Sequence, residues 1–150
     1  ALPILERKPW RLQQQETLSL QFWRFEYQPH PKEERYEVLG RAYPLTKGLP
    51  EWATHIEELW FAVYLNDSRG RVLAKDVQVL PPNDLTPDVV EEGLPFHFAL
   101  QPEDIGQSGP LFVTFGYRMV LTPSPGVAAS DEAQKEPRVF FANEGALSPL

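Results

Sequence analysis

Three histidines are the residues of this chain best suited to acid–base or metal chemistry: His30, His55 and His97. They stand far apart in the sequence, and none lies at metal-ligand spacing from another. A metal site needs several convergent ligands, so the spacing favours solvated loop or outward-facing strand residues over a metal centre. The chain has no cysteine, which excludes thiolate catalysis and cysteine-ligated zinc. We therefore expect no metal or other cofactor.

Glu57-Glu58 and Glu91-Glu92 are pairs of carboxylates that are adjacent in the sequence. Neighbours on a strand point to opposite faces, so neither pair forms a catalytic dyad by itself. Asn66-Asp67 and Asn83-Asp84 suit turns, because the spacing and the closing glutamate of an EF-hand are missing. The sequence also has no Gly-x-Ser-x-Gly motif and no glycine-rich phosphate loop. We predict no catalytic residue, and a hydrolase with a loop-built site stays open as an alternative.

Aromatic residues provide the stronger functional hypothesis. One predicted strand carries only apolar side chains on one of its two faces, namely Leu59, Phe61, Val63 and Leu65. Trp60 and Tyr64 lie on the opposite face. If this face is exposed, both rings form a patch for a partner protein or a sugar, with Trp52 as a further candidate. If a loop or a second layer covers it, both rings are structural.

Composition limits the class of protein. The chain has 150 residues, which suits one domain, and its hydrophobic content of 42% is that of a globular protein. Sixteen prolines predict many turns and few helices. The net charge of −7 argues against nucleic acid and against anionic lipid surfaces as partners. We find no apolar run long enough to span a bilayer.

The elements that must position these residues are strands. Residues 58–73 predict a β-hairpin, because two apolar runs flank the turn-forming residues 66–70. Further strands are predicted over residues 17–27, 36–43, 95–100 and 111–121. A change of parity near Trp23 predicts a bulge or a crossing between sheets, and Pro29 and Pro31 predict a loop. The predicted fold is an antiparallel two-layer β-sandwich of about seven strands.

The domain organisation follows from the same pattern. Residues 1–15 are expected to form an N-terminal extension, and residues 16–121 the sandwich. Residues 122–150 read as a linker-like segment, rich in Pro, Ser and Ala, with an expected edge strand at 138–142.

The middle of the chain resembles small immunoglobulin-like β-sandwich domains of the bacterial envelope that carry a Phe-x-Leu-Tyr-Asp signature. The matching residues are Val38-Leu39-Gly40-Arg41-Ala42, Leu59-Trp60-Phe61-Ala62-Val63-Tyr64-Leu65-Asn66-Asp67, Gly70-Arg71-Val72-Leu73-Ala74 and Pro95-Phe96-His97-Phe98. The resemblance implies an exported protein, periplasmic or lipid-anchored as a lipoprotein, whose domain binds another envelope protein and catalyses nothing. It assigns no functional residue.

Two classes of function therefore lead. The first is a non-enzymatic envelope domain that acts in protein–protein interaction or assembly. The second is a carbohydrate-binding module that uses Trp60, Tyr64 and Trp52. A sugar site needs two or three coplanar exposed rings, whereas a protein interface needs a broader apolar patch with a polar rim.

Overall fold

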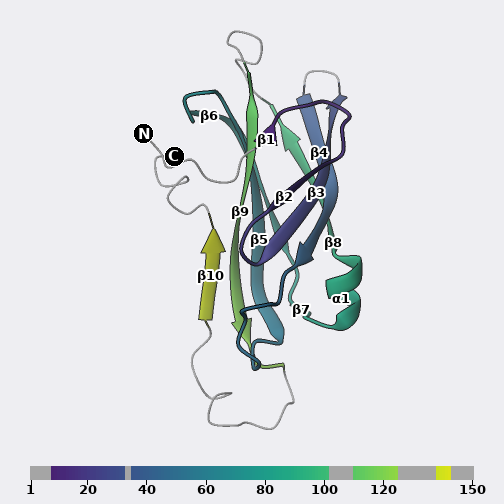
Figure 1. Ribbon diagram of the computed structural model, residues 1–150, viewed down its shortest axis with the longest axis vertical. Helices are drawn as coiled ribbons and strands as arrows, with labels where there is room; N and C mark the ends of the chain where they lie inside the picture. The colour runs from purple at the N-terminus through teal and green to yellow at the C-terminus, as the bar shows by residue number, and fades with distance from the viewer. Residues whose placement is uncertain (1–7, 33–34, 102–109, 125–137, 143–150) are drawn as a thin grey trace.

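Two antiparallel sheets lie face to face and confirm the predicted all-β, two-layer architecture (Figure 1). The computed structural model describes residues 8–32, 35–101, 110–124 and 138–142. The smaller sheet, sheet B, has the strand order β2 (Glu16–Ser19), β3 (Trp23–Lys32), β4 (Arg35–Pro44) and β8 (Leu94–Leu100). The larger sheet, sheet A, has the order β1 (Lys8–Pro9), β9 (Phe112–Thr122), β5 (His55–Asn66) and β6 (Val72–Leu80), with β10 (Arg138–Ala142) paired to β9 and β7 (Asn83–Asp84) paired to β5.

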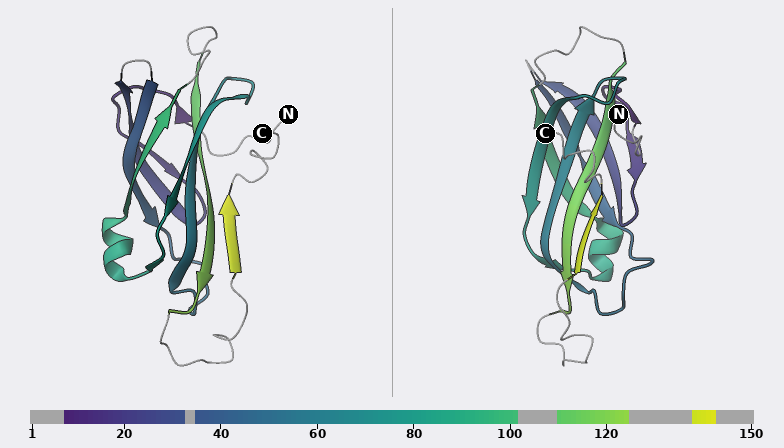
Figure 2. Two further views of the ribbon diagram at one scale, coloured as in Figure 1. Left: turned by 180° about the vertical axis from the view of Figure 1, so that it is seen from behind. Right: turned by 90° about the vertical axis from the view of Figure 1, so that its left-hand side faces the viewer.

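The chain alternates between the sheets after each hairpin. It passes from β4 to β5, forms the β5–β6 hairpin, and returns through β7 and the short helix α1 (Pro87–Glu92) to β8 beside β4. It then crosses again to β9 beside β5. Figure 2 shows the two layers from behind and from the side, with α1 at one end of the sandwich. None of the described helices is long and apolar enough to cross a membrane.

The predicted β5–β6 hairpin is present, and its turn depends on Asp67. The Asp67 Oδ1 atom accepts hydrogen bonds from the backbone N–H groups of Arg69 and Arg71, both at 2.9 Å. The Nε of Arg71 donates to Oδ2 at 2.7 Å, and Gly70 has φ +83°. Burial alone would raise the pKa of Asp67, but these hydrogen bonds outweigh it and lower the pKa. Asp67 therefore stabilises the turn in its ionised, carboxylate form.

The single strand predicted over residues 17–27 is wrong. The chain forms a hairpin there, in which β2 pairs with β3 and Leu18 lies opposite Phe25. The N–H of Leu20 donates to the carbonyl of Trp23 at 2.8 Å and closes the turn. In both strands of the hairpin every second residue is buried in the same core. The turn between the strands shifts the buried positions from even to odd residue numbers, and this shift is the change of parity seen near Trp23.

The loop predicted from Pro29 and Pro31 is also wrong, since β3 continues through both prolines and pairs with β4. In an antiparallel pair, alternate residues direct their backbone groups away from the partner strand. Pro29 does so, because its carbonyl accepts the N–H of Gln13 at 2.7 Å on the edge opposite β4. Both prolines thus occupy positions where pairing with β4 requires no backbone N–H group.

The core lies between the two sheets and is rich in aromatic rings. Phe115 of β9 stacks on Phe25 of β3 with ring centroids 4.5 Å apart, and it also contacts Phe96 and Phe98 of β8. Phe61 of β5 meets Phe25 edge-on at 5.2 Å. Phe61 and Phe115 are fully buried. The predicted inward faces of β5, β8 and β9 are therefore correct.

The two ends of the chain also contribute strands to the β9 edge. β1 lies within the first fifteen residues and pairs with Phe112 and Val113, and Trp10 packs edge-on against Tyr36 at 5.7 Å. β10 pairs with β9 between Tyr117 and Leu121. Residues 125–137, which belong to the expected linker-like segment, lie outside the described residues, as do the predicted loop residues 102–109.

Candidate functional site

The outer face of sheet A carries an exposed apolar surface. Val79 and Val77 of β6 point outward and are 77% and 47% exposed. The register of the sheet places half-buried Trp60 of β5 directly beside Val79. We call Trp60, Val77 and Val79 the β6 strip. On the other side of Trp60 lies Arg118 of β9.

A charged rim accompanies the β6 strip. The Nη1 of Arg118 donates to the Oε2 of Glu58 at 3.1 Å, and Lys75 is exposed at the other end of the outer face. Exposed apolar side chains bordered by charged groups are the arrangement expected of a protein interface rather than of a folded core.

Tyr64 does not join this surface. It lies on the outer face with Trp60, as its parity predicts, but it is only 3% exposed. Ala62, between the two, is fully buried, and Val120 of β9 is 5% exposed. The outer face of sheet A is therefore divided into a buried part around Tyr64 and an accessible part along β6.

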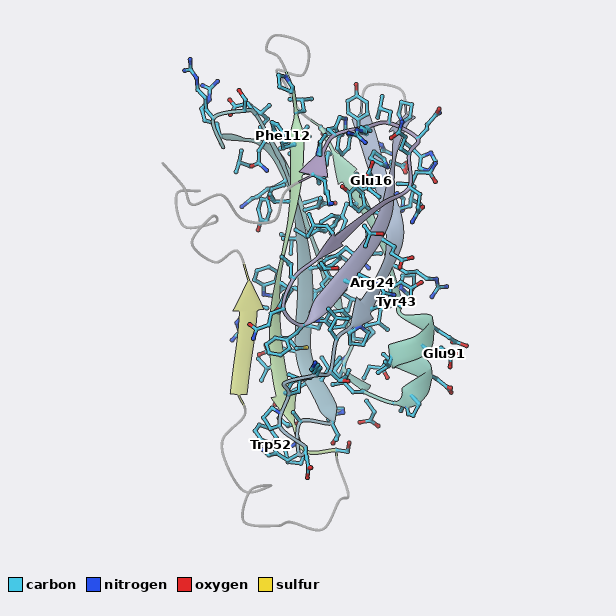
Figure 3. All side chains as sticks on the ribbon, in the orientation of Figure 1. Glu16, Arg24, Tyr43, Trp52, Glu91 and Phe112 are labelled. Atoms are coloured by element: carbon cyan, nitrogen blue, oxygen red, sulfur yellow. The ribbon has the colours of Figure 1, made fainter. Side chains whose placement is uncertain are left out.

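Trp52 lies far from the β6 strip. It belongs to the connection between β4 and β5, at the lower end of the sandwich in Figure 3. Its half-buried ring packs against the core cluster. The three aromatic residues singled out from the sequence thus occupy three different environments, and only Trp60 lies beside exposed apolar residues.

The histidines are dispersed over the molecule, and two of them pair with carboxylates. His97 points outward from β8, and its Nε2 lies 2.6 Å from the Oε2 of Glu37 on β4. Glu37 is 5% exposed although it lies on the outer face of sheet B, and its Oε1 is 3.8 Å from the Nη2 of Arg35. Sequence reasoning missed this cluster, because only the β4–β8 register brings Glu37 and His97 together.

The second pair lies at the lower end of sheet A. The Nδ1 of His55 on β5 is 2.7 Å from the Oδ1 of Asp84 on β7. Nearby, the hydroxyls of Thr54 and Ser124 are 2.8 Å apart. Across the residues that the structure describes, no three His, Asp or Glu side chains are grouped closely enough to hold a metal ion.

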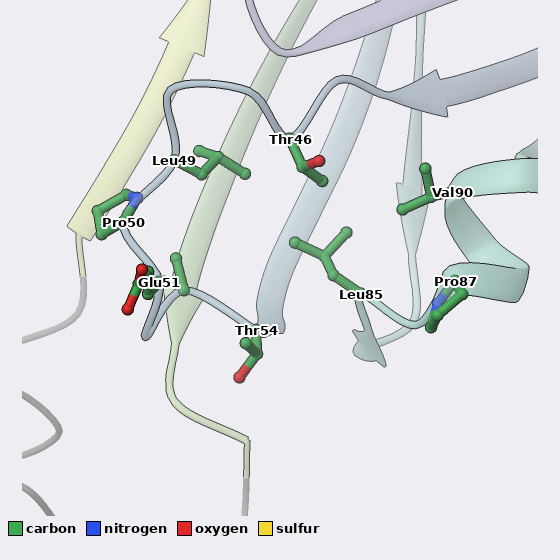
Figure 4. Close-up of a pocket in the computed structure, with 9 residues that line it drawn as sticks. Thr46, Leu49, Pro50, Glu51, Thr54, Leu85, Pro87 and Val90 are labelled. Atoms are coloured by element: carbon green, nitrogen blue, oxygen red, sulfur yellow. The ribbon is translucent and has the colours of Figure 1, made fainter.

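A pocket of about 360 Å³ opens between the β4–β5 connection and α1 (Figure 4). Leu49 and Leu85 point toward each other across it, and Ala53 and Val90 complete an apolar lining. Of the described residues that line it, only Glu51 is a carboxylate, and none is a histidine. The described part of the lining is therefore mainly apolar and holds no pair of titratable side chains.

Comparison with known proteins finds no family model, no curated protein and no solved structure that matches this chain.

Proposed function

We propose that this chain is a non-enzymatic β-sandwich domain that binds another protein through the β6 strip. The observation that carries the proposal is the exposure of Val79 beside Trp60. A valine that is 77% exposed gains little from folding, but it can be buried at an interface. Trp60 supplies the large, partly buried ring that such interfaces use as an anchor.

A protein partner fits the strip better than a sugar does. A sugar platform needs several exposed coplanar rings, whereas Trp60 has aliphatic neighbours and Tyr64 is 3% exposed. The paired charges of Glu58 and Arg118 provide a polar rim. We expect the partner to present an apolar side chain to Val77 and Val79.

The finer classification belongs to the same proposal. The strand neighbours support an immunoglobulin-like sandwich, with β3, β4 and β8 in the places of strands A, B and E. β5, β9 and β10 then take the places of strands C, F and G, and β6 that of C′. The resemblance to envelope domains supports a periplasmic or lipid-anchored location, which fractionation of cells that express the full-length protein would test.

Site-specific photo-crosslinking tests the binding surface. A photoreactive residue at position 79 should capture a partner in living cells. The same residue at position 39 is the matched control, because Leu39 is 39% exposed but lies on the outer face of sheet B. After identification by mass spectrometry, the purified partner should bind wild type and Leu39→Lys equally, and Val79→Lys more weakly by about tenfold or more.

Equal capture from positions 79 and 39, or equal binding by Val79→Lys and wild type, would contradict the proposal. Val79→Lys should fold normally, because substitutions at exposed sites change stability by only about 0.5 kcal/mol. Thermal unfolding of the variant is therefore the control for its folding.

A further inference from the structure

The β8 edge of sheet B is closed against pairing with another strand. The edge of β8 that faces away from β4 presents Pro95, His97 and Ala99. Pro95 has no N–H. The N–H of His97 donates to the Oε1 of Gln78 at 3.0 Å, and that of Ala99 donates to the Oδ2 of Asp76 at 2.9 Å. Both acceptors belong to β6, the edge strand of the other sheet.

The same carboxylate also binds one outward backbone donor of β6. The Oδ1 of Asp76 accepts a hydrogen bond from the N–H of Val77 at 2.9 Å, while its Oδ2 accepts one from the N–H of Ala99. Asp76 and Gln78 thus bind the two free backbone donors of β8 and one outward donor of β6. Such blocking is how soluble β-proteins prevent unwanted association at strand edges.

The opposite edge of sheet B lacks this protection. In β2, the backbone hydrogen bond between Leu20 and Trp23 marks Leu20 as a residue whose backbone groups point to β3. Because this direction alternates along a strand, the N–H and carbonyl groups of Leu18 also point to β3. Thr17 and Ser19 therefore direct their N–H and carbonyl groups away from the sheet. No proline interrupts β2, and no side chain among the described residues bonds to these groups. Figure 2 shows β2 as the outermost strand of its sheet.

We propose that β2 is a strand-addition site and that its occupant is a second copy of this chain. A two-fold axis between the copies makes the strands antiparallel and joins the two B sheets into one continuous sheet. With Leu18 opposite its own counterpart, Thr17 of one copy faces Ser19 of the other. Each Thr17–Ser19 pair exchanges two backbone hydrogen bonds, so the symmetric interface contains four.

The side chains of β2 are compatible with this pairing. Thr17 and Ser19 are exposed, short and uncharged, and Thr–Ser pairs are favourable across antiparallel strands. The one acidic residue of the strand, Glu16, lies 3.6 Å from Arg11 of its own chain. In the symmetric register Glu16 faces Leu20, so no like charges oppose each other. Because the contact is one short strand, the dimer should be weak and concentration-dependent.

This inference stands apart from the proposed function. β2 belongs to sheet B and the β6 strip to the outer face of sheet A, so the failure of one leaves the other intact. If both hold, the dimer displays two β6 strips, and a partner with two binding sites would gain from avidity.

Sedimentation velocity over a concentration series tests the dimer. The wild-type mass should rise from one copy toward two. The double variant Thr17→Pro/Ser19→Pro removes both free donors but none of the donors that bond to β3, and it should raise the dissociation constant by on the order of tenfold or more. The control Thr17→Val/Ser19→Val keeps every N–H and should dimerise like wild type.

Amide hydrogen exchange of the wild type provides an independent readout, which holds even if the proline variant fails to fold. Exchange at Thr17 and Ser19 should slow as concentration rises, while that of Leu18, already bonded within the chain, should not change. A wild type that stays monomeric throughout the series would overturn the proposal. So would a dimer in which the Thr17 and Ser19 amides exchange at an unchanged rate.

Discussion

At the scale of single residues, two buried tyrosines differ in whether their hydroxyls are bonded. Tyr27 is fully buried, and its hydroxyl has no hydrogen-bond partner among the described residues. Tyr117 is equally inaccessible, but its hydroxyl interacts with the backbone of Phe22. A buried polar group without a partner destabilises the folded state, whereas one with a partner does not.

We therefore expect Tyr27→Phe to raise the free energy of unfolding by about 1 kcal/mol, and Tyr117→Phe to lower it by about 1 kcal/mol. Urea denaturation of both variants measures the difference. A loss of stability in Tyr27→Phe would show that its hydroxyl is satisfied in solution.

The dependence of the free energy of unfolding on pH above 10 gives a second measurement on the same tyrosines. Burial raises the pKa of Tyr117 to about 12, and burial also raises the pKa of Tyr27 above its ordinary value of 10.0. The folded state resists ionisation of these hydroxyls, so stability is unaffected below pH 10 and falls as the pH rises above it. Each Phe variant should lose stability less steeply in this range than wild type.

At the scale of elements, Asp76 and Gln78 protect the edge of β8 and cover one backbone donor of β6. Asp76→Ala removes two hydrogen bonds from backbone donors to a carboxylate and should lower the free energy of unfolding by about 2 kcal/mol. The double variant Asp76→Ala/Gln78→Ala also frees the N–H of His97. Because an unprotected edge can pair with another chain, this variant should aggregate faster than wild type.

Light scattering during incubation near the unfolding temperature measures the aggregation. Lys75→Ala is the control, since Lys75 also lies on β6 but points to the outer face. Equal aggregation of the control and the double variant would mean that edge protection is not the role of Asp76 and Gln78.

At the scale of the whole molecule, one core joins the two sheets. Phe61 and Phe115 of sheet A both contact Phe25 of sheet B. Truncating either residue to alanine should lower the free energy of unfolding by about 3–5 kcal/mol, because the cavity lies between both layers. Val79→Ala should change it by less than about 0.5 kcal/mol.

Chemical denaturation followed by circular dichroism and by tryptophan fluorescence measures these losses. The two signals should report one transition, because neither sheet has a core of its own. A loss below about 1 kcal/mol for Phe115→Ala would contradict the assignment of the buried faces.

The sequence by itself determined the class of fold and the buried faces of its main strands. Alternation along β5, β8 and β9 is a local property, since side chains two residues apart point to the same side of any strand. The turn at Asp67 and Gly70 was equally readable, because it depends on residues adjacent in the chain. The hairpin of β2 and β3 could not be read from the sequence. Both of its strands bury every second residue, so in the sequence the turn between them looks only like a change of parity within one strand.

Only the tertiary structure decided which residues on the outward faces meet. Trp60 and Tyr64 share a parity, yet the first lies beside exposed Val79 and the second is buried, since exposure depends on segments distant in sequence. The pairing of His97 with Glu37 and the blocking of β8 by Asp76 depend on strand neighbours that no local pattern encodes. Strand pairing is a long-range choice made by the core as a whole, so the sites built on it appear only when the sheets are assembled.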